Sequence, residues 1–164
     1  MTKTTSNTTS WDDASNEAKN SFVSWGKIGD FVYGTLVGVK QVKSTLPGKE
    51  GQLQNVYEVK VKQSSYHNLD EDKRPMEKPE TPEEGEIVSV GGRAGTDSRM
   101  ARVKIGQMFG QKFVEELPAQ TKGFNKTKII KVFTPKDITT GEYLMDEEFL
   151  AEQQADVHGV ENDF

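Results

Sequence analysis

The fold is decided by residues 29–43, which read GDFVYGTLVGVKQVK. They are rich in β-branched and aromatic residues, but 15 residues is long for one strand, and Gly34 and Gly38 interrupt it. Glycine inside a strand marks a bulge, a tight bend or a close backbone approach. A long strand that bends can pair at both ends, as the first strand of a small closed barrel does. We therefore expect a barrel closed onto this strand; a long edge strand of a sandwich is the alternative.

The best strand pattern in the chain follows a turn rich in glycine. Residues 53–65 alternate apolar and polar side chains, with Val59 and Val61 on one face and Lys60 and Lys62 on the other. Such alternation predicts a strand with one buried face and one solvated face that carries lysine.

Three further strands are expected at 86–90, 108–116 and 127–134, with a short helix that ends near Val103. The helix therefore falls between the third and fourth strands, which is the order of an OB-fold. An SH3-like barrel would not place its helix there, and an immunoglobulin sandwich would need more strands. The predicted fold class is mainly all-β: a five-stranded OB-fold barrel with disordered or partly helical termini.

Composition divides the chain into three parts. We expect a flexible N-terminal segment at 1–24, an OB-fold nucleic-acid-binding domain at 25–140 and an acidic C-terminal tail at 141–164. Residues 66–85 hold three prolines and dense charge, so they are expected to form a solvated loop insertion within the domain.

The net charge of -5 conceals an uneven distribution. Residues 26–140 carry 19 basic and 15 acidic side chains, and 8 of those acids lie within 69–86. Residues 141–164 carry 8 acids and neither lysine nor arginine. A basic body that contains one acidic loop and is followed by an acidic C-terminal end is suited to a polyanionic partner.

Several functional classes find no support in the residues. The chain has no cysteine, and its 2 histidines, His67 and His158, lie far apart, so we expect no metal, no cofactor and no enzymatic activity. Absence of a secretory h-region and of any apolar span near 18 residues predicts a cytoplasmic protein that does not engage a membrane. Residues 91–95, GGRAG, lack the Gly-Lys-Ser/Thr ending of a phosphate loop, so a strand exit with a phosphate-contacting Arg93 is expected there.

The phrase GDxVxGxL at 29–36, the helix after the third strand and KIGQ at 104–107 resemble the OB-fold single-stranded DNA-binding proteins of bacteriophages. The acidic C-terminus, with Glu161, Asp163 and Phe164, resembles the tails of bacterial and phage members. The resemblance implies coating of single-stranded DNA during replication, recombination or repair, and a tail that docks partner proteins and competes with DNA. Bacterial tails usually have proline where Asp163 stands, which puts their usual docking partners in doubt.

Single-strand binding needs cations for phosphates and exposed rings for bases. In an OB-fold the groove crosses strands two and three, between the loops expected here at 44–52 and 117–126. Alternation points Phe31 and Tyr33 outward, either toward the groove or under the N-terminal segment. The predicted nucleic-acid-binding residues are Phe31, Tyr33, Lys40, Lys43, Lys60, Lys62, Tyr66, Arg93, Arg99, Lys112, Lys122, Phe124, Lys126 and Lys128.

A different class of protein also fits this pattern. A virion structural or assembly protein built on a small barrel would use the polar N-terminus and the acidic insertion as interaction arms. It would form stable homo-oligomers and would not respond to DNA, whereas a single-stranded DNA-binding protein binds DNA whether or not it oligomerises.

Overall fold

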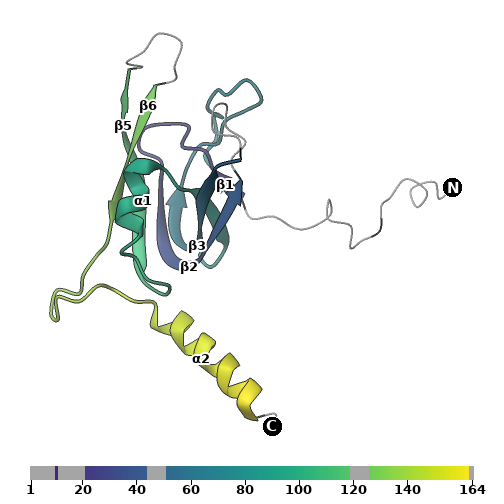
Figure 1. The fold of residues 1–164 in the computed structure, drawn as a ribbon. Helices are drawn as coiled ribbons and strands as arrows, with labels where there is room; N and C mark the ends of the chain where they lie inside the picture. The colour runs from purple at the N-terminus through teal and green to yellow at the C-terminus, as the bar shows by residue number, and fades with distance from the viewer. Residues whose placement is uncertain (1–9, 11–20, 44–50, 119–125, 163–164) are drawn as a thin grey trace.

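A computed structural model describes residue 10 and residues 21–43, 51–118 and 126–162, with side chains up to 154 (Figure 1). The described chain is mainly β, as expected from the sequence. Its elements are β1 (Ser21–Val23), β2 (Phe31–Lys43), β3 (Leu53–Ser65), β4 (Ile87–Gly91), α1 (Ala94–Met100), β5 (Met108–Leu117), β6 (Thr127–Phe133) and α2 (Glu147–Asn162).

The strand β2 organises the sheet, whose order is β1-β4-β3-β2-β5-β6. It pairs with β3 along its whole length and with β5 over Phe31 to Thr35. The register with β3 shifts at Tyr33/Gly34 and at Leu36/Gly38, so the bends predicted at both glycines are confirmed. At Gly34 a Cβ atom would lie 2.2 Å from the Lys60 carbonyl oxygen, which leaves room for glycine alone.

The described chain has six strands, whereas the sequence predicted five. The additional strand, β1, lies in the segment that we expected to be flexible and runs parallel to β4 from Ser21↔Val88 to Val23↔Val90. Three residues are too few to show a strand period in the sequence, and only their pairing with β4 defines them.

Residues 21–25 also lie between β4 and β6, which are not neighbours in the described strand order. The ammonium group of Lys128 on β6 donates to the carbonyl oxygens of Ser24 at 3.2 Å and Trp25 at 2.6 Å. Trp25 itself is 1% exposed and belongs to the core, with Val32, Val59 and Phe113. Residues 21–25 therefore pack as part of the body between β4 and β6.

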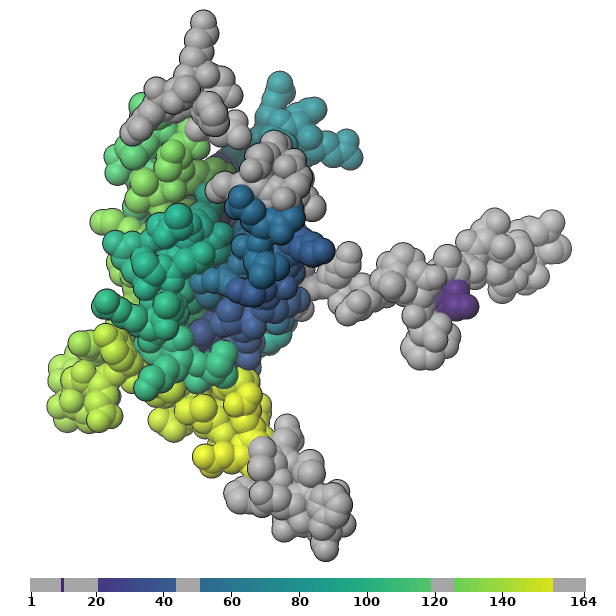
Figure 2. All heavy atoms as spheres, in the orientation of Figure 1, coloured from purple at the N-terminus to yellow at the C-terminus, as the bar shows by residue number. Residues whose placement is uncertain are grey.

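The chain stays on the body for several residues beyond residue 140, where we expected the acidic C-terminal tail to begin. The Met108 N–H donates to the Leu144 carbonyl at 2.9 Å, and the Asp146 N–H donates to the Gly106 carbonyl at 2.7 Å. After its first turn, α2 projects away from the body (Figures 1 and 2). None of the helices in the described residues has the length and hydropathy required to cross a membrane.

Candidate nucleic-acid interface

Two of the predicted stacking rings lie on the outer face of the sheet. Alternation along β2 points Val32 and Leu36 into the core and leaves Phe31 and Tyr33 half-buried on the opposite face. Tyr33 is in register with Gly110 on β5, and Gly110 is in register with Phe133 on β6. Strand pairing therefore aligns two rings in one row, with a glycine between them.

Gly110 leaves an open position between these rings. The hollow there has a volume of about 350 Å³ and is lined by Phe31, Val32, Tyr33, Gly110, Gln111, Lys112 and Phe133. A Cβ atom on Gly110 would lie 3.4 Å from Tyr33 Cδ1, so any side chain would enter this hollow. A backbone floor between two aromatic walls is suited to a flat ring.

The next cross-strand row carries cations. Phe31 is in register with Lys112, and Lys112 with Lys131. Both lysines are exposed, and neither forms a salt bridge within the described residues. We call Phe31, Tyr33, Gly110, Lys112, Lys131 and Phe133 the aromatic face; it combines rings with cations that are free to meet phosphate.

Phe133 and Lys131 were missed by the sequence reasoning. Alternation around the buried Ile130 placed both on the outer side of β6, so the signal for their direction was present. The information that was absent was the register between β5 and β6, which brings Phe133, 50% exposed, beside Gly110. Register depends on contacts between distant segments and cannot be read from one strand.

Lys60 and Lys62 lie on the other side of Tyr33, beside an acidic segment. A hollow of about 610 Å³ separates them from residues 144–148, and Tyr33 lines it as well. Lys62 forms a 3.3 Å ion pair with Glu84. These two lysines therefore already face carboxylates, unlike the lysines of the aromatic face.

Asp146 holds the acidic segment in this position. Its Oδ2 accepts a 2.6 Å hydrogen bond from the Thr35 hydroxyl, and its Oδ1 accepts from the Phe149 N–H at 3.0 Å. Burial opposes ionisation, but these hydrogen bonds and the charge of Lys60 together hold the pKa of Asp146 below its ordinary value. The ionised carboxylate of Asp146 therefore lies near Lys60 on the outer face.

A second group of predicted cations gathers around α1 and β6. Arg93, Arg99 and Lys128 line a hollow of about 340 Å³ between these elements. The Arg99 guanidinium donates to the Gly95 carbonyl at 2.7 Å, and Lys126 lies 3.7 Å from Glu116. Among the described residues, Arg93, Arg99 and Lys128 form no salt bridge.

Lys128 is not the free phosphate contact that the sequence suggested. Its ammonium group donates to two main-chain carbonyls, as described above, and lies 5.6 Å from the centre of the Phe113 ring. Burial and the nearby charge of Arg93 lower its pKa. Lys128 therefore links β6 to residues 24 and 25, and its ammonium group is already hydrogen-bonded there.

The prediction that Tyr66 stacks on a base is wrong. Its side chain is 0% exposed, and its hydroxyl donates to Ser21 Oγ at 3.1 Å. Burial raises the pKa of this hydroxyl. The end of a strand is not an exposed position here, because the insertion folds back to pair Glu80 with Tyr66 and β1 lies nearby.

The remaining predicted residues do not join the aromatic face. Lys40 and Lys43 lie on the distal half of β2, which pairs with β3 but not with β5. Glu161 belongs to α2. Lys122, Phe124, Asp163 and Phe164 lie outside the described residues.

Within the part of the chain that the structure describes, the close pair of His67 and Asp30 has a structural role. His67 Nδ1 lies 2.7 Å from Asp30 Oδ1, and Asp30 Oδ2 accepts hydrogen bonds from two main-chain N–H groups, so this pair fixes a turn. The described residues contain no group of three or more His, Cys, Asp or Glu that could hold a metal ion.

Comparisons with protein-family models, curated proteins and solved structures gave no match for this chain.

Proposed function

We propose that this protein binds single-stranded DNA without sequence specificity and that the aromatic face is its principal contact surface. The observation that carries this proposal is the row in which Tyr33 and Phe133 flank Gly110. Beside it lie Lys112 and Lys131, which form no salt bridge with any described residue. Stacking of a base on an aromatic ring contributes about 1–3 kcal/mol and tolerates every base, because each base has a π face. Lysines beside the rings supply the contacts to phosphate.

The connectivity supports an OB-type fold as part of this proposal. In an OB-fold the first strand pairs with the second and fourth strands, and β2 pairs in the same way with β3 and β5. The helix α1 lies between β4 and β5, at the position expected for that fold. In the fold that we propose, the segment from β1 to Trp25 lies between β4 and β6 and is an addition to the five strands of an OB-type barrel.

Charge supports a role in coating DNA during replication, recombination or repair, in the manner of the bacteriophage single-stranded DNA-binding proteins. The cations of the aromatic face are exposed, whereas the acids gather in the 66–85 insertion and in the C-terminal region. An acidic helix that projects from the body, as α2 does, is a suitable contact for replication or recombination proteins.

Fluorescence anisotropy with labelled oligo-dT and oligo-dA tests this proposal. We expect binding to both, with affinity that falls steeply between 50 and 200 mM salt, because bound phosphates release counterions. Tyr33→Ala and Phe133→Ala should each weaken binding by roughly 5- to 150-fold, the equivalent of one lost stacking contact. Tyr143→Ala is the matched control, because Tyr143 is 48% exposed on the C-terminal segment and does not line the hollow at Gly110.

The outcomes separate the two classes of function. If neither the full chain nor a chain that ends at residue 153 binds oligo-dT at low salt, the aromatic face is not a DNA site. Stable homo-oligomers combined with no response to DNA would instead favour a virion assembly protein built on a small barrel.

A further inference from the structure

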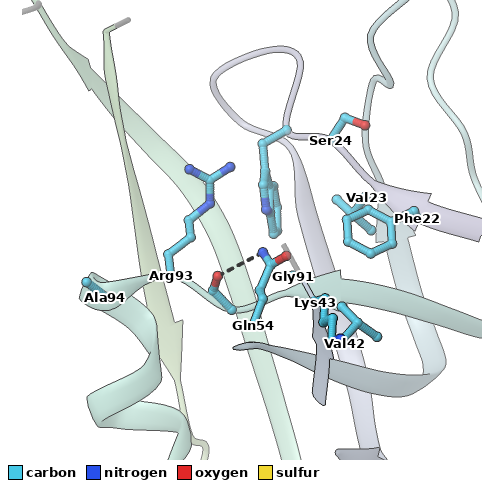
Figure 3. Close-up of a pocket in the computed structure, with 11 residues that line it drawn as sticks. Phe22, Val23, Ser24, Val42, Lys43, Gln54, Gly91, Arg93 and Ala94 are labelled. Atoms are coloured by element: carbon cyan, nitrogen blue, oxygen red, sulfur yellow. Dashed lines mark hydrogen bonds between the residues drawn. The ribbon is translucent and has the colours of Figure 1, made fainter. Parts of the chain in front are cut away.

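A second hollow lies away from the aromatic face. It has a volume of about 620 Å³ and is bounded by β1, the distal ends of β2 and β3, and the turn from β4 into α1 (Figure 3). Its lining includes Phe22, Trp25, Lys43, Gln54 and Arg93, and none of these belongs to the aromatic face. The two surfaces can therefore be tested separately.

The described lining of this hollow carries positive charge and no carboxylate. Arg93 and Lys43 supply the positive charge. Arg93 is exposed, so an anion that enters the hollow can reach its guanidinium. After burial, the charge of Arg93 is the next cause of the lowered pKa of Lys128, so an anion bound at Arg93 would lie near two cations.

The other side of the hollow is apolar. Phe22 is 48% exposed, and it lies so close to Gly91 that a Cβ atom there would be 3.1 Å from Phe22 Cζ. Val23, next to Phe22 in β1, is buried, and the buried Trp25 also lines the hollow. Figure 3 shows Arg93 and Phe22 on opposite sides, with Gln54 between them.

The polar group in the middle is held in place by the main chain. The Gln54 amide donates to the Gly92 carbonyl at 3.2 Å, and the Gly92 N–H donates to the Asn55 carbonyl at 2.6 Å. Across the hollow lie a cation, an amide and an exposed ring. The cation matches a phosphate, the amide matches a sugar or a base edge, and the ring matches the face of a base.

We propose that this hollow binds one nucleoside monophosphate, with the phosphate on Arg93 and the base against Phe22. The ligand is a phosphomonoester that carries a base, whether free or at the phosphorylated end of a strand. A pocket with walls on several sides suits a single nucleotide better than a continuous strand, which needs an open path at both ends. This site adds selective binding of one nucleotide to the non-specific coating proposed above.

Trp25 provides the assay, since Trp11 is the other of the 2 tryptophans in the chain. In full-length protein with Trp11→Phe, thymidine 5′-monophosphate should change the Trp25 fluorescence saturably. Thymidine should bind at least tenfold more weakly, because it cannot form the charge-assisted contact with Arg93. Comparable binding of thymidine and its monophosphate would overturn the proposal, and this comparison needs no pocket variant.

Variants then assign the contacts. Arg93→Gln should weaken monophosphate binding at least tenfold, whereas Arg102→Gln, which alters an exposed arginine outside the hollow, should leave it unchanged. Phe22→Ala should weaken binding of the monophosphate but not of inorganic phosphate. If a folded Arg93→Gln protein, checked by circular dichroism, binds the monophosphate normally, Arg93 is not the phosphate contact and the proposal fails.

The source of the ligand is resolved with oligo-dT of five nucleotides, with and without a 5′-phosphate. Tighter binding of the phosphorylated oligonucleotide supports a strand end, and a response to the monophosphate alone supports a free nucleotide; a response to neither overturns the site. Tyr33→Ala should leave the Trp25 signal unchanged while it weakens oligo-dT anisotropy, so failure of this site and failure of the aromatic face can be told apart.

Discussion

Filling the position at Gly110 should abolish base stacking without disturbing the fold. In Gly110→Val the new Cβ atom would lie 3.4 Å from Tyr33 Cδ1 and 3.5 Å from the Val32 carbonyl oxygen, both ordinary contact distances. The backbone of Gly110 is not in the left-handed region, and valine favours strands more than glycine does. We therefore expect the thermal unfolding midpoint to stay the same or to rise.

The effect on DNA follows from the space that the two methyl groups occupy. They would fill the hollow between Tyr33 and Phe133, whose volume is about 350 Å³ and whose floor is Gly110 itself. Excluding one base from its stacked position costs about 1–3 kcal/mol, so affinity for oligo-dT should fall roughly 5- to 150-fold. Gly110→Ala adds a single methyl group and should have a smaller effect.

Anisotropy at constant salt, with unfolding followed by circular dichroism, measures both consequences on the same protein samples. The salt slope should not change, because valine removes no phosphate contact. If Gly110→Val binds oligo-dT as tightly as the unmodified chain, bases do not enter this hollow and the aromatic face has been assigned wrongly.

Three further perturbations test other parts of the structure. Lys128→Met should lower the free energy of unfolding by about 2 kcal/mol, because two carbonyls lose a charged donor, whereas the exposed Lys131→Met should change it little; urea denaturation compares them. Tyr66→Phe removes one hydrogen bond and should cost about 0.5–1.5 kcal/mol of stability without affecting DNA affinity, and a loss of DNA affinity in a stable protein would contradict its place in the core. Because folding lowers the pKa of Asp146, its carboxylate stabilises the fold at pH values above the ordinary carboxyl pKa. This stabilisation is lost as the pH falls through the pKa that Asp146 has in the folded protein. Asp146→Asn should therefore reduce the difference in the free energy of unfolding between pH 7 and pH 3.

Local signals predicted most of the fold. Gly34 and Gly38 marked the bends of β2, where its register with β3 shifts, and at Gly34 the Lys60 carbonyl leaves no space for a side chain. The lysine face of β3 followed from its alternation in the same way. The strand β1 could not be found by such means, since Ser21–Val23 is too short to show a period and depends on its partner β4.

The candidate site was predictable only in part, because it depends on register. The outward direction of Phe31 and Tyr33 followed from alternation, but their neighbours Lys112 and Phe133 were set by pairing between β2, β5 and β6. The prediction for Tyr66 was wrong for the converse reason. Its position at a strand end suggested exposure, but contacts with the distant Ser21 and Glu80 bury its side chain.

The charges on either side of Tyr33 indicate how a bound strand should run. Toward β3, Lys60 and Lys62 face Asp146 and Glu84, so a phosphate there would meet carboxylates that already neutralise the lysines. Toward β6, the row that holds Lys112 and Lys131 has no described acidic partner. We therefore expect DNA that stacks on Tyr33 to continue across β5 and β6, which departs from the path over strands two and three of an OB-fold. Lys131→Gln should accordingly lower the salt slope of oligo-dT binding by about 1, whereas Lys62→Gln should leave it nearly unchanged.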